Sequence, residues 1–286
     1  FVATGGDQIP YFEMDRSSSQ FGRQAGQVSF TEGVNINVNA SILRTTPDGR
    51  LLLVVSDNDI IFVDVGRDSA VFAEGFTTLG GQDFFFTDLA VHPSGYYAYG
   101  VDSGGNCLVV GLDPFQPTYL SPAQFFQSPE GALFQRVALS PDGSRCFLTT
   151  RNGGLGGNYE LEVWDCSAPA TPSYLLTSVL VAGATPGETA TLSLHPSGDR
   201  LYVDIAGIGA TYLDCSGVYG AVPTPPTFVN NVAEGGRQTR LNHLFTPDGT
   251  RLFQSQNGDT GVGVFDLRYA VDLRVVSGAG QTGVGG

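Results

Sequence analysis

The sequence predicts an all-β fold made of about six copies of one four-stranded unit. Three observations carry this prediction: a proline-containing turn recurs five times, apolar strand patterns flank each turn, and glycine and proline are spread along the chain. The 286 residues include 39 glycines and 16 prolines, and 41% of the residues are hydrophobic. Many short strands joined by tight turns have this composition. Because all-β domains of this length are common, we expect a single domain over residues 1–286.

The five turns share one pattern: a hydroxyl residue or histidine, then Pro, then Asp or Ser, then Gly. They are Thr46–Gly49, His92–Gly95, Ser140–Gly143, His195–Gly198 and Thr246–Gly249, and their prolines lie 46 to 55 residues apart. Proline presets φ at the second position of such a turn, Asp or Ser bonds back to the backbone, and glycine takes a positive φ. Apolar-alternating stretches such as Thr87–Val91 and Tyr96–Val101 lie on the two sides, so each turn predicts a β-hairpin.

A third strand ending in Asp follows each hairpin, and a more variable fourth strand, such as Tyr174–Val181, comes after it. The third strands are expected at Ile60–Asp64, Leu108–Asp113, Leu161–Asp165, Ala210–Asp214 and Val262–Asp266. Four antiparallel strands in a repeat of about 50 residues are the pattern of a β-propeller blade. No segment carries a sustained helical period, which excludes a solenoid of stacked helices.

The two ends of the chain are expected to share one blade. Phe1–Gly5 and Ile9–Asp15 match the second and third strands of the repeat, and Leu273–Val276 and Gly280–Thr282 follow the last complete unit. The prediction is therefore a propeller of six four-stranded blades, closed by N- and C-terminal strands in the same blade, which removes two exposed sheet edges. Seven blades would result if the sequence were part of a longer protein.

The turn and the strand after it resemble a known propeller repeat. Ser140–Thr150 (SPDGSRCFLTT) and His195–Asp204 (HPSGDRLYVD) are similar to the YVTN-type repeat, and Leu161–Pro172 and Thr211–Asp214 are similar to the related LVIVD repeat. The resemblance covers nearly the whole chain and implies a propeller. Such repeats are found in surface-layer and other extracellular proteins, in lactonase-like enzymes and in partner-binding modules. Function must therefore be argued from the site.

Propeller ligands commonly bind at one mouth of the central channel, beside the start of the innermost strands. Alignment on the turn prolines places Asp88, Arg136 and, one step further in, His243 at this mouth. These three form the only neighbouring set that could perform acid–base chemistry or hold a carboxylate. The site motifs of lactonase-like propellers have no residue-by-residue match here, and polar residues are expected along a water-filled channel. No catalytic residue is assigned, and the three remain candidates.

No metal or other cofactor is expected. His92 and His195 occupy the turn position that hydroxyl residues hold elsewhere, where we expect them to bond the turn backbone, so a histidine-rich metal site is not predicted. The acidic turns Asp57–Asp59 and Asn257–Asp259 could bind calcium through oxygen ligands, although hairpin turns favour these residue types in any case. The sequence contains no phosphate-binding glycine loop and no nucleophile-elbow motif.

The four cysteines do not define a disulfide framework. Cys166 and Cys215 hold equivalent places in successive units, where regular blades keep them too far apart for a bridge. Cys146 aligns with apolar residues and is expected to be a buried thiol, and Cys107 could be either bonded or a thiol.

Phenylalanines gather at 84–86 and 125–126, in connections between successive units. We expect them to wedge between blades. In the alternative interpretation they form an exposed aromatic patch, in which Phe84, Phe85 and Phe86, together with Arg237, would bind a protein or carbohydrate partner.

Charge restricts the partners of this chain. Its 28 acidic and 14 basic residues give a formal net charge of −14, and every basic residue is an arginine. Nucleic acids and anionic membranes require a basic surface, so neither is expected as a partner. No apolar run is long enough for membrane insertion. Arginine-only cations, Asn/Gly/Thr-rich turns and the glycosylation-type triplet Asn39–Ser41 favour a secreted or cell-surface protein.

Together these features favour an extracellular or cell-surface propeller that acts as a structural or protein-interaction module without catalysis, through a protein partner or self-assembly. Two alternatives stay open: a lactonase-like hydrolase with its site at the channel mouth, and a carbohydrate-binding propeller. Turnover of a sugar lactone would identify the first, and binding to a glycan would identify the second.

Overall fold

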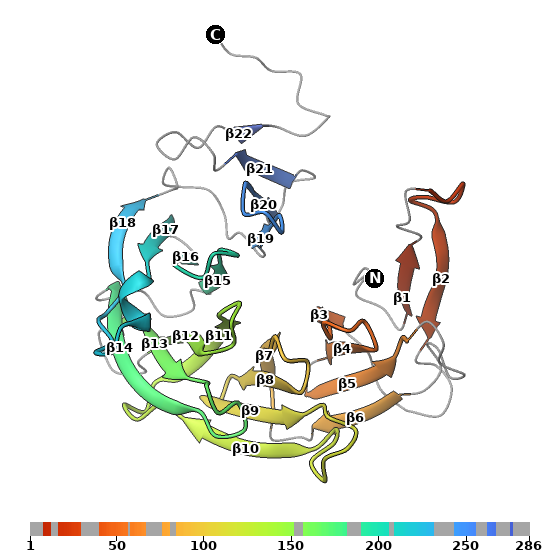
Figure 1. Cartoon of the computed structure of the whole chain (residues 1–286), viewed down its shortest axis with the longest axis horizontal. Helices are drawn as coiled ribbons and strands as arrows, with labels where there is room; N and C mark the ends of the chain where they lie inside the picture. The colour runs from red at the N-terminus through yellow and green to blue at the C-terminus, as the bar shows by residue number, and fades with distance from the viewer. Residues whose placement is uncertain are drawn as a thin grey trace. The chain divides into compact units, whose positions relative to one another are not determined.

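A computed structural model describes residues 8–12, 17–29, 40–56, 58–66, 76–80, 84–151, 157–181, 190–205, 209–231, 243–255, 262–266 and 275–276. Contacts divide the chain into two compact units. Unit 1 comprises Phe1–Val137 and Pro169–Thr171, and unit 2 comprises Ala138–Ala168 and Pro172–Gly286. Figure 1 shows the sheets within each unit. The prediction of a single domain is not tested by this division.

Unit 1 holds a two-stranded sheet, β1–β2, and two four-stranded sheets, β3–β6 and β7–β10, in which each strand pairs with the next along the chain. Its strands are β1 (Gln8–Phe12), β2 (Gln24–Ser29), β3 (Ala40–Thr45), β4 (Leu51–Ser56), β5 (Asp59–Asp64), β6 (Phe76–Gly80), β7 (Phe86–Val91), β8 (Tyr97–Asp102), β9 (Asn106–Gly111) and β10 (Pro122–Gln127). The boundary between the units falls inside the next strand, β11 (Leu133–Leu139).

Unit 2 continues the same topology, with β11–β14, β15–β18 and β19–β22 as four-stranded sheets in chain order. Its strands after β11 are β12 (Arg145–Arg151), β13 (Tyr159–Asp165), β14 (Ser173–Val181), β15 (Ala190–Leu194), β16 (Arg200–Ile205), β17 (Gly209–Asp214), β18 (Thr227–Asn231), β19 (His243–Phe245), β20 (Arg251–Ser255), β21 (Val262–Asp266) and β22 (Val275–Val276). A 3₁₀ turn, Ser216–Tyr219, is the one helical segment among the residues described. That part of the chain contains no helix long and apolar enough to cross a membrane.

The blade count differs from the prediction of six four-stranded blades. Four sheets have strands of five to nine residues, whereas β19–β22 begins with a three-residue strand and ends with a two-residue strand. The remaining sheet, β1–β2, has two strands within the described ranges. The sequence of this N-terminal repeat lacks the proline turn that joins the first two strands in each four-stranded sheet. Closure of a shared blade by the chain ends involves residues largely outside those ranges and stays a prediction.

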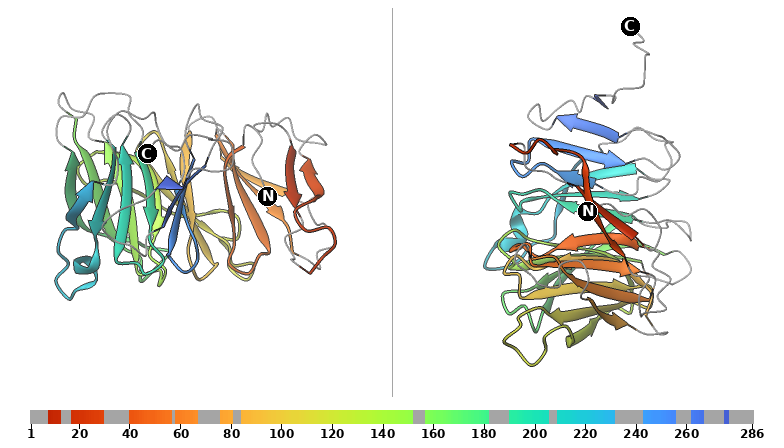
Figure 2. Two further views of the ribbon diagram at one scale, coloured as in Figure 1. Left: turned by 90° about the horizontal axis from the view of Figure 1, so that it is seen from above. Right: turned by 90° about the vertical axis from the view of Figure 1, so that its right-hand side faces the viewer.

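The five proline turns form as expected and join the first and second strands of the five four-stranded sheets. Their glycines have positive φ angles of +69° at Gly49, +75° at Gly95, +74° at Gly143, +80° at Gly198 and +67° at Gly249. In each turn the glycine N–H donates to the carbonyl of the first turn residue at 2.8–2.9 Å. A positive φ is unfavourable for residues with a Cβ, so glycine is required at this position. The left view of Figure 2 shows coloured turns at the lower ends of the strands.

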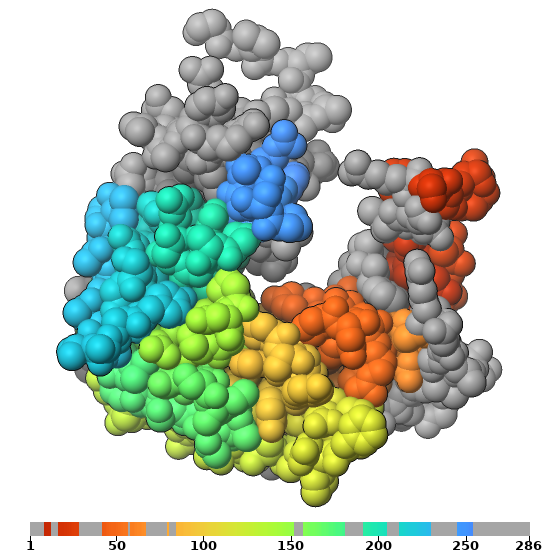
Figure 3. Space-filling view, in the orientation of Figure 1, coloured from red at the N-terminus to blue at the C-terminus, as the bar shows by residue number. Residues whose placement is uncertain are grey.

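The core of unit 1 lies between its two four-stranded sheets. Leu53, Val55 and Phe62 from β4 and β5 pack with Leu89 and Leu108 from β7 and β9, all at most 2% exposed. Figure 3 shows the orange residues of the first sheet in contact with the yellow residues of the second. A second cluster joins β1–β2 to the opposite face of sheet β3–β6. Both faces of this sheet are therefore buried, as sheet-on-sheet packing requires.

Gly100 of β8 permits a close approach of the two four-stranded sheets in unit 1. A Cβ at this position would lie 3.0 Å from the Ile60 Cδ1 atom and 3.2 Å from a ring carbon of Phe86. Such distances are shorter than ordinary carbon contacts, so a larger residue would force the two sheets apart.

Candidate functional site

The strands that begin the four-stranded sheets, β3, β7, β11, β15 and β19, are called the first strands. Two of them, β3 and β7, carry a β-bulge at equivalent positions. The pairing of β3 with β4 shifts between Ala40 and Ile42, and the pairing of β7 with β8 shifts between Phe86 and Asp88. The equivalent strand β15 pairs with β16 without a shift. A bulge leaves one residue unpaired and turns neighbouring side chains, and bulges are frequent beside functional sites. In β7 the unpaired residue is Thr87, next to the candidate Asp88.

Asp88 connects three strands of unit 1. The residue is 5% exposed, and its carboxylate accepts hydrogen bonds from the N–H of Leu89 at 2.8 Å and of Val137 at 3.1 Å. The Nη2 of Arg44 lies 3.4 Å from Asp88 Oδ1. Arg44 is in β3 and Val137 is in β11, so the carboxylate joins these first strands to β7. A buried charge needs such partners, because an unpaired one is costly.

Arg136 lies beside the same bulge. Its Nη1 donates to the carbonyl oxygens of Thr87 and Gln135, both at 2.8 Å. The hydroxyl of Thr87 in turn donates to the Gln135 carbonyl at 3.0 Å. The structure therefore brings the predicted candidates Asp88 and Arg136 together on adjacent first strands of unit 1, each bonded across the gap between β7 and β11.

Arg44 is the residue of this cluster that sequence reasoning missed. Its side chain is 42% exposed, whereas that of Asp88 is 7% exposed, so the pair presents a cation to solvent above a buried anion. Alignment on the turn proline compares residues at equal spacing, and Arg44 lies three residues before Pro47, whereas Asp88 and Arg136 lie five residues before their prolines. A signal was present: Arg44 is the one charged residue in β3 (Ala40–Thr45).

The third candidate, His243, is in β19 of unit 2, and its backbone pairs with Gln254. Its side chain lies outside what the structure describes, so its role stays a prediction. Arg237 is also outside the described residues.

The phenylalanines divide between core and surface. Phe86 is 6% exposed and belongs to the core between the sheets, and Phe84 packs against this core with its ring stacked on Phe86 at 5.5 Å between centroids. These two residues wedge between the sheets, as expected. Phe85 is 56% exposed and Phe125 is 47% exposed, so these two rings do not wedge between the sheets, and partner binding by exposed phenylalanines stays a prediction.

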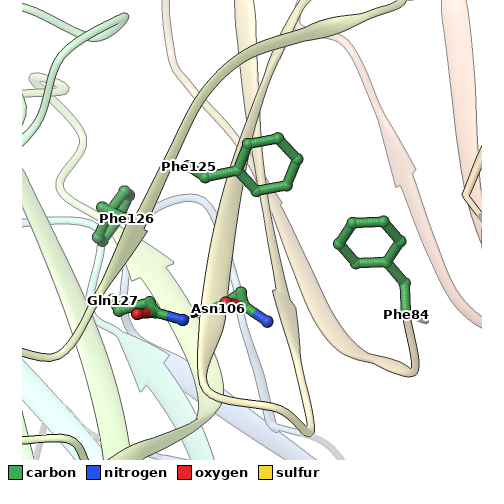
Figure 4. Close-up of a pocket in the computed structure, with 5 residues that line it drawn as sticks. All are labelled: Phe84, Asn106, Phe125, Phe126 and Gln127. Atoms are coloured by element: carbon green, nitrogen blue, oxygen red, sulfur yellow. Dashed lines mark hydrogen bonds between the residues drawn. The ribbon is translucent and has the colours of Figure 1, made fainter.

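A pocket of about 460 Å³ lies next to these rings. Figure 4 shows the residues that line it: Phe84, Asn106, Phe125, Phe126 and Gln127. Asn106 begins β9 and pairs with Gln127 at the end of β10. Phe86, at the start of β7, pairs with Asp102, the last residue of β8. A short turn then leads from Asp102 to Asn106 at the start of β9. The pocket and Asp88 therefore lie toward the same end of the strands in sheet β7–β10.

The histidines of the turns bond the backbone, as predicted. The N–H groups of Ser94 and Ser197 donate to Nδ1 of His92 and of His195 at 3.2 and 3.1 Å. Nε2 of His195 then donates to the Gly249 carbonyl at 3.0 Å, which connects turns of neighbouring sheets in unit 2. Both side chains have structural partners that account for their presence.

Neither calcium turn gains support. Asn257–Asp259 and Asp57 lie outside the described residues, and burial raises the pKa of the Asp59 carboxyl above its ordinary value of 3.8. The part of the chain that the structure describes contains no group of three or more His, Cys, Asp or Glu side chains placed to hold a metal ion. Calcium binding is therefore untested.

All four cysteines are buried thiols rather than disulfides. Cys166 and Cys215 are each 0% exposed, and burial, with a smaller contribution from Asp214, raises the pKa of the Cys215 thiol to about 12. The expectation that this pair would not bond and that Cys146 would be a buried thiol is confirmed, and Cys107 is resolved as a thiol.

No protein-family model matches the chain, and no curated protein matches it. The resemblance to YVTN and LVIVD repeats is therefore not supported beyond the propeller fold itself.

Solved structures do match. A putative 6-phosphogluconolactonase from Bacteroides fragilis is 15% identical with a TM-score of 0.67, and the match covers 94% of this chain and 75% of that one. A periplasmic gluconolactonase from Pseudomonas aeruginosa is 18% identical with a TM-score of 0.65, covering 89% and 72%. The β-propeller domain of Cps50 (Swd1) from Myceliophteria thermophila is 15% identical with a TM-score of 0.62, covering 89% and 76%.

These similarities establish an all-β chain with a β-propeller arrangement. Two of these matched proteins are described as a putative 6-phosphogluconolactonase and a gluconolactonase, which contradicts the prediction of a non-catalytic structural or interaction module as the main interpretation. That prediction rested on the repeat, which explains most residues of the sequence, and on the lack of a recognisable catalytic motif.

Proposed function

We propose that this protein hydrolyses a sugar lactone, with its site at the bulged first strands β3 and β7 and the neighbouring β11. The observation that carries the proposal is the Asp88 carboxylate, buried and fixed between three strands, with the half-exposed guanidinium of Arg44 beside it. The likeness in fold to proteins described as gluconolactonases supports the same reaction class.

Lactone hydrolysis needs a base that activates water and a positive group that stabilises the carbonyl oxygen. Water attacks the carbonyl carbon, the ring C–O bond breaks, the ring oxygen takes a proton, and the product is a hydroxy acid. A carboxylate can accept the proton of the attacking water, and positive groups stabilise the negative charge that develops on the carbonyl oxygen. Asp88 is proposed for the first task and Arg44 for the second.

The hydrogen-bond geometry leaves room for this role. An ionised carboxylate offers about four acceptor sites, and three at Asp88 are taken by Leu89, Val137 and Arg44. One site remains to accept a hydrogen bond from water or from a substrate hydroxyl. Arg136, with its Nη1 committed to two carbonyls, holds the strands beside this site.

An acidic product suits a site that contains arginine. The hydroxy acid carries a new carboxylate, and a phosphorylated lactone carries a phosphate from the start; guanidinium binds both groups well. In a chain with a net charge of −14, a local cation is needed to attract such a ligand.

The test is turnover of gluconolactone and of 6-phosphogluconolactone, followed by acid release in weak buffer and corrected for spontaneous hydrolysis. The natural chain should exceed the background rate for at least one lactone. Arg44→Gln should lower kcat/KM by about tenfold or more, while Arg23→Gln, which removes another exposed arginine from the turn between β1 and β2, should leave it unchanged. Absence of turnover of both lactones, or equal rates for the two variants, would overturn the proposal.

We also propose a secreted or cell-surface location. The support is the lysine-free acidic composition and the triplet Asn39–Ser41. Fractionation of the source cells, with detection of the chain outside the cytoplasm, tests it.

A further inference from the structure

The pocket between the β6–β7 connection and the outer strands of sheet β7–β10 has two chemically different walls (Figure 4). One wall is aromatic and the other is made of side-chain amides. Four of the five residues that line the pocket are on β9 and β10, so the pocket is separate from the cluster of Asp88, Arg44 and Arg136 on the first strands.

The aromatic wall is rigid. The rings of Phe84 and Phe125 stack with centroids 5.9 Å apart and an angle of 16° between their planes. Phe84 is itself stacked on the buried Phe86, and Phe126, 9% exposed, packs edge-on against Phe134 at 5.9 Å. Since the inner rings are held by the core, the half-exposed Phe125 is a fixed apolar surface facing solvent rather than a mobile side chain.

The amide wall is also fixed in orientation. Both carboxylate oxygens of the buried Asp102 accept hydrogen bonds from Asn106, one from its backbone N–H and one from Nδ2, each at 2.8 Å. The Oδ1 of Asn106 then accepts a hydrogen bond from Nε2 of Gln127 at 2.7 Å. This bond uses one N–H of an exposed Gln127 amide, which has a second N–H and a carbonyl to offer a ligand.

The lining residues carry no charge, whereas the chain as a whole is strongly acidic. An ionic ligand would find no partner in this pocket. A volume of about 460 Å³ lies within the range of small-molecule sites. The ligand that fits has an apolar face for the phenylalanine rings and neutral hydroxyls that can both donate to and accept from amides.

We propose that this pocket binds a neutral saccharide, with the C–H face of one sugar ring against Phe125 and its hydroxyls bonded to Gln127 and Asn106. A sugar ring has both surfaces, since its ring C–H groups gather on one face and its hydroxyls lie around the rim. The proposal is independent of lactone hydrolysis, because it concerns binding without turnover and uses residues on other strands.

The test uses uncharged tetrasaccharides as probes: cellotetraose, maltotetraose and tetra-N-acetylchitotetraose, titrated into the intact chain and followed by isothermal calorimetry and ligand-observed NMR. At least one should bind saturably. Phe125→Ala and Gln127→Ala, both at exposed positions, should each weaken binding by about tenfold. Phe115→Ala is the matched control, since Phe115 is 91% exposed in the β9–β10 connection and outside the pocket.

Three results would overturn the proposal: no binding of any probe, binding that Phe125→Ala leaves unchanged, or tighter binding of an apolar phenylalanine-containing peptide than of every saccharide. Lactone turnover is measured on the same variants. If Phe125→Ala loses saccharide binding but keeps turnover, the pocket is separate from the hydrolytic site; if Arg44→Gln loses turnover but keeps saccharide binding, only the proposed function depends on Arg44.

Discussion

Replacing Asp88 by Asn tests the central element of the site, because it removes the negative charge while keeping the shape of the side chain. In the natural chain one carboxylate oxygen accepts from Leu89 N–H at 2.8 Å and lies 3.4 Å from Arg44, and the other accepts from Val137 N–H at 3.1 Å. An amide has one carbonyl and one NH₂ group, so its NH₂ must face one of these N–H donors. A buried donor is then left without an acceptor.

The expected cost follows from this geometry. An unsatisfied buried donor costs about 1–3 kcal/mol, and loss of the ion pair with the half-exposed Arg44 adds at most about 1 kcal/mol. We therefore expect Asp88→Asn to lower the free energy of unfolding by about 2 kcal/mol. Asp88→Ala should cost more, because it leaves two backbone N–H groups without acceptors.

Guanidinium denaturation followed by far-UV circular dichroism measures the loss, with Glu130→Gln as the control for an exposed carboxylate in the loop before β11. Hydrogen exchange gives a local measurement: the peptide covering β11 should exchange faster in Asp88→Asn than in Glu130→Gln, because Val137 N–H has lost its acceptor. A loss of less than about 0.5 kcal/mol with unchanged exchange in β11 would refute the idea that Asp88 holds these strands together.

Three further predictions concern the turns and the cysteines. Gly249→Ala should destabilise the chain more than Gly22→Ala. Both glycines have a positive φ, but a Cβ at position 249 would collide with the His195 ring, whereas a Cβ at position 22 would meet no atom within 4 Å. The Gly249→Ala variant should therefore have the lower thermal unfolding midpoint, and equal midpoints would contradict this. The hydrogen bond from the Thr246 hydroxyl is the main cause that lowers the pKa of Asp248 from 3.8 to about 2. Because the pKa is lower in the folded chain than in the unfolded one, the ionised carboxylate stabilises the fold fully above pH 4, and this stabilisation is lost as pH falls toward 2. Asp248→Asn should therefore lose less stability between pH 4 and pH 2 than the natural chain, as measured by denaturation at several pH values. The four buried thiols should not react with a thiol reagent such as DTNB in the native state and should all react in guanidinium, and rapid labelling of the native chain would show that the cysteines are accessible.

The repeat could be predicted because its signals are local. Each proline turn specifies its own φ angles, and the glycines at Gly49, Gly95, Gly143, Gly198 and Gly249 all adopt the positive φ that the turn requires. The strands follow because an apolar alternation on both sides of a fixed turn pairs in only one register. Closure of a propeller depends on contacts between distant segments, for which the sequence has no comparable local signal. The predicted number of blades was wrong, and the difference includes the N-terminal repeat, which lacks a proline turn and has two strands among the described residues.

The candidate site was predictable in part for the same reason. Asp88 and Arg136 were identified because their spacing from the turn proline places them at the start of neighbouring first strands. Arg44 was missed because the candidates were sought four and five residues before the turn prolines, whereas Arg44 lies three residues before Pro47. The pocket of Phe84 and Phe125 was predicted only as two phenylalanine runs, since the stacking that joins them is a tertiary contact between residues 41 positions apart.

Arg44 separates the structural and chemical roles of the site better than Asp88 does. Substitution of Asp88 changes the packing of three strands at once, so a fall in turnover could follow from displaced strands as well as from a lost base. Arg44 contributes one half-exposed side chain, whose ion pair is worth about 1 kcal/mol or less to stability, but its guanidinium lies directly beside the Asp88 carboxylate. A variant Arg44→Gln that unfolds at the natural midpoint and yet loses turnover would therefore assign chemistry to this cluster, whereas unchanged turnover would leave Asp88 as a structural link between first strands.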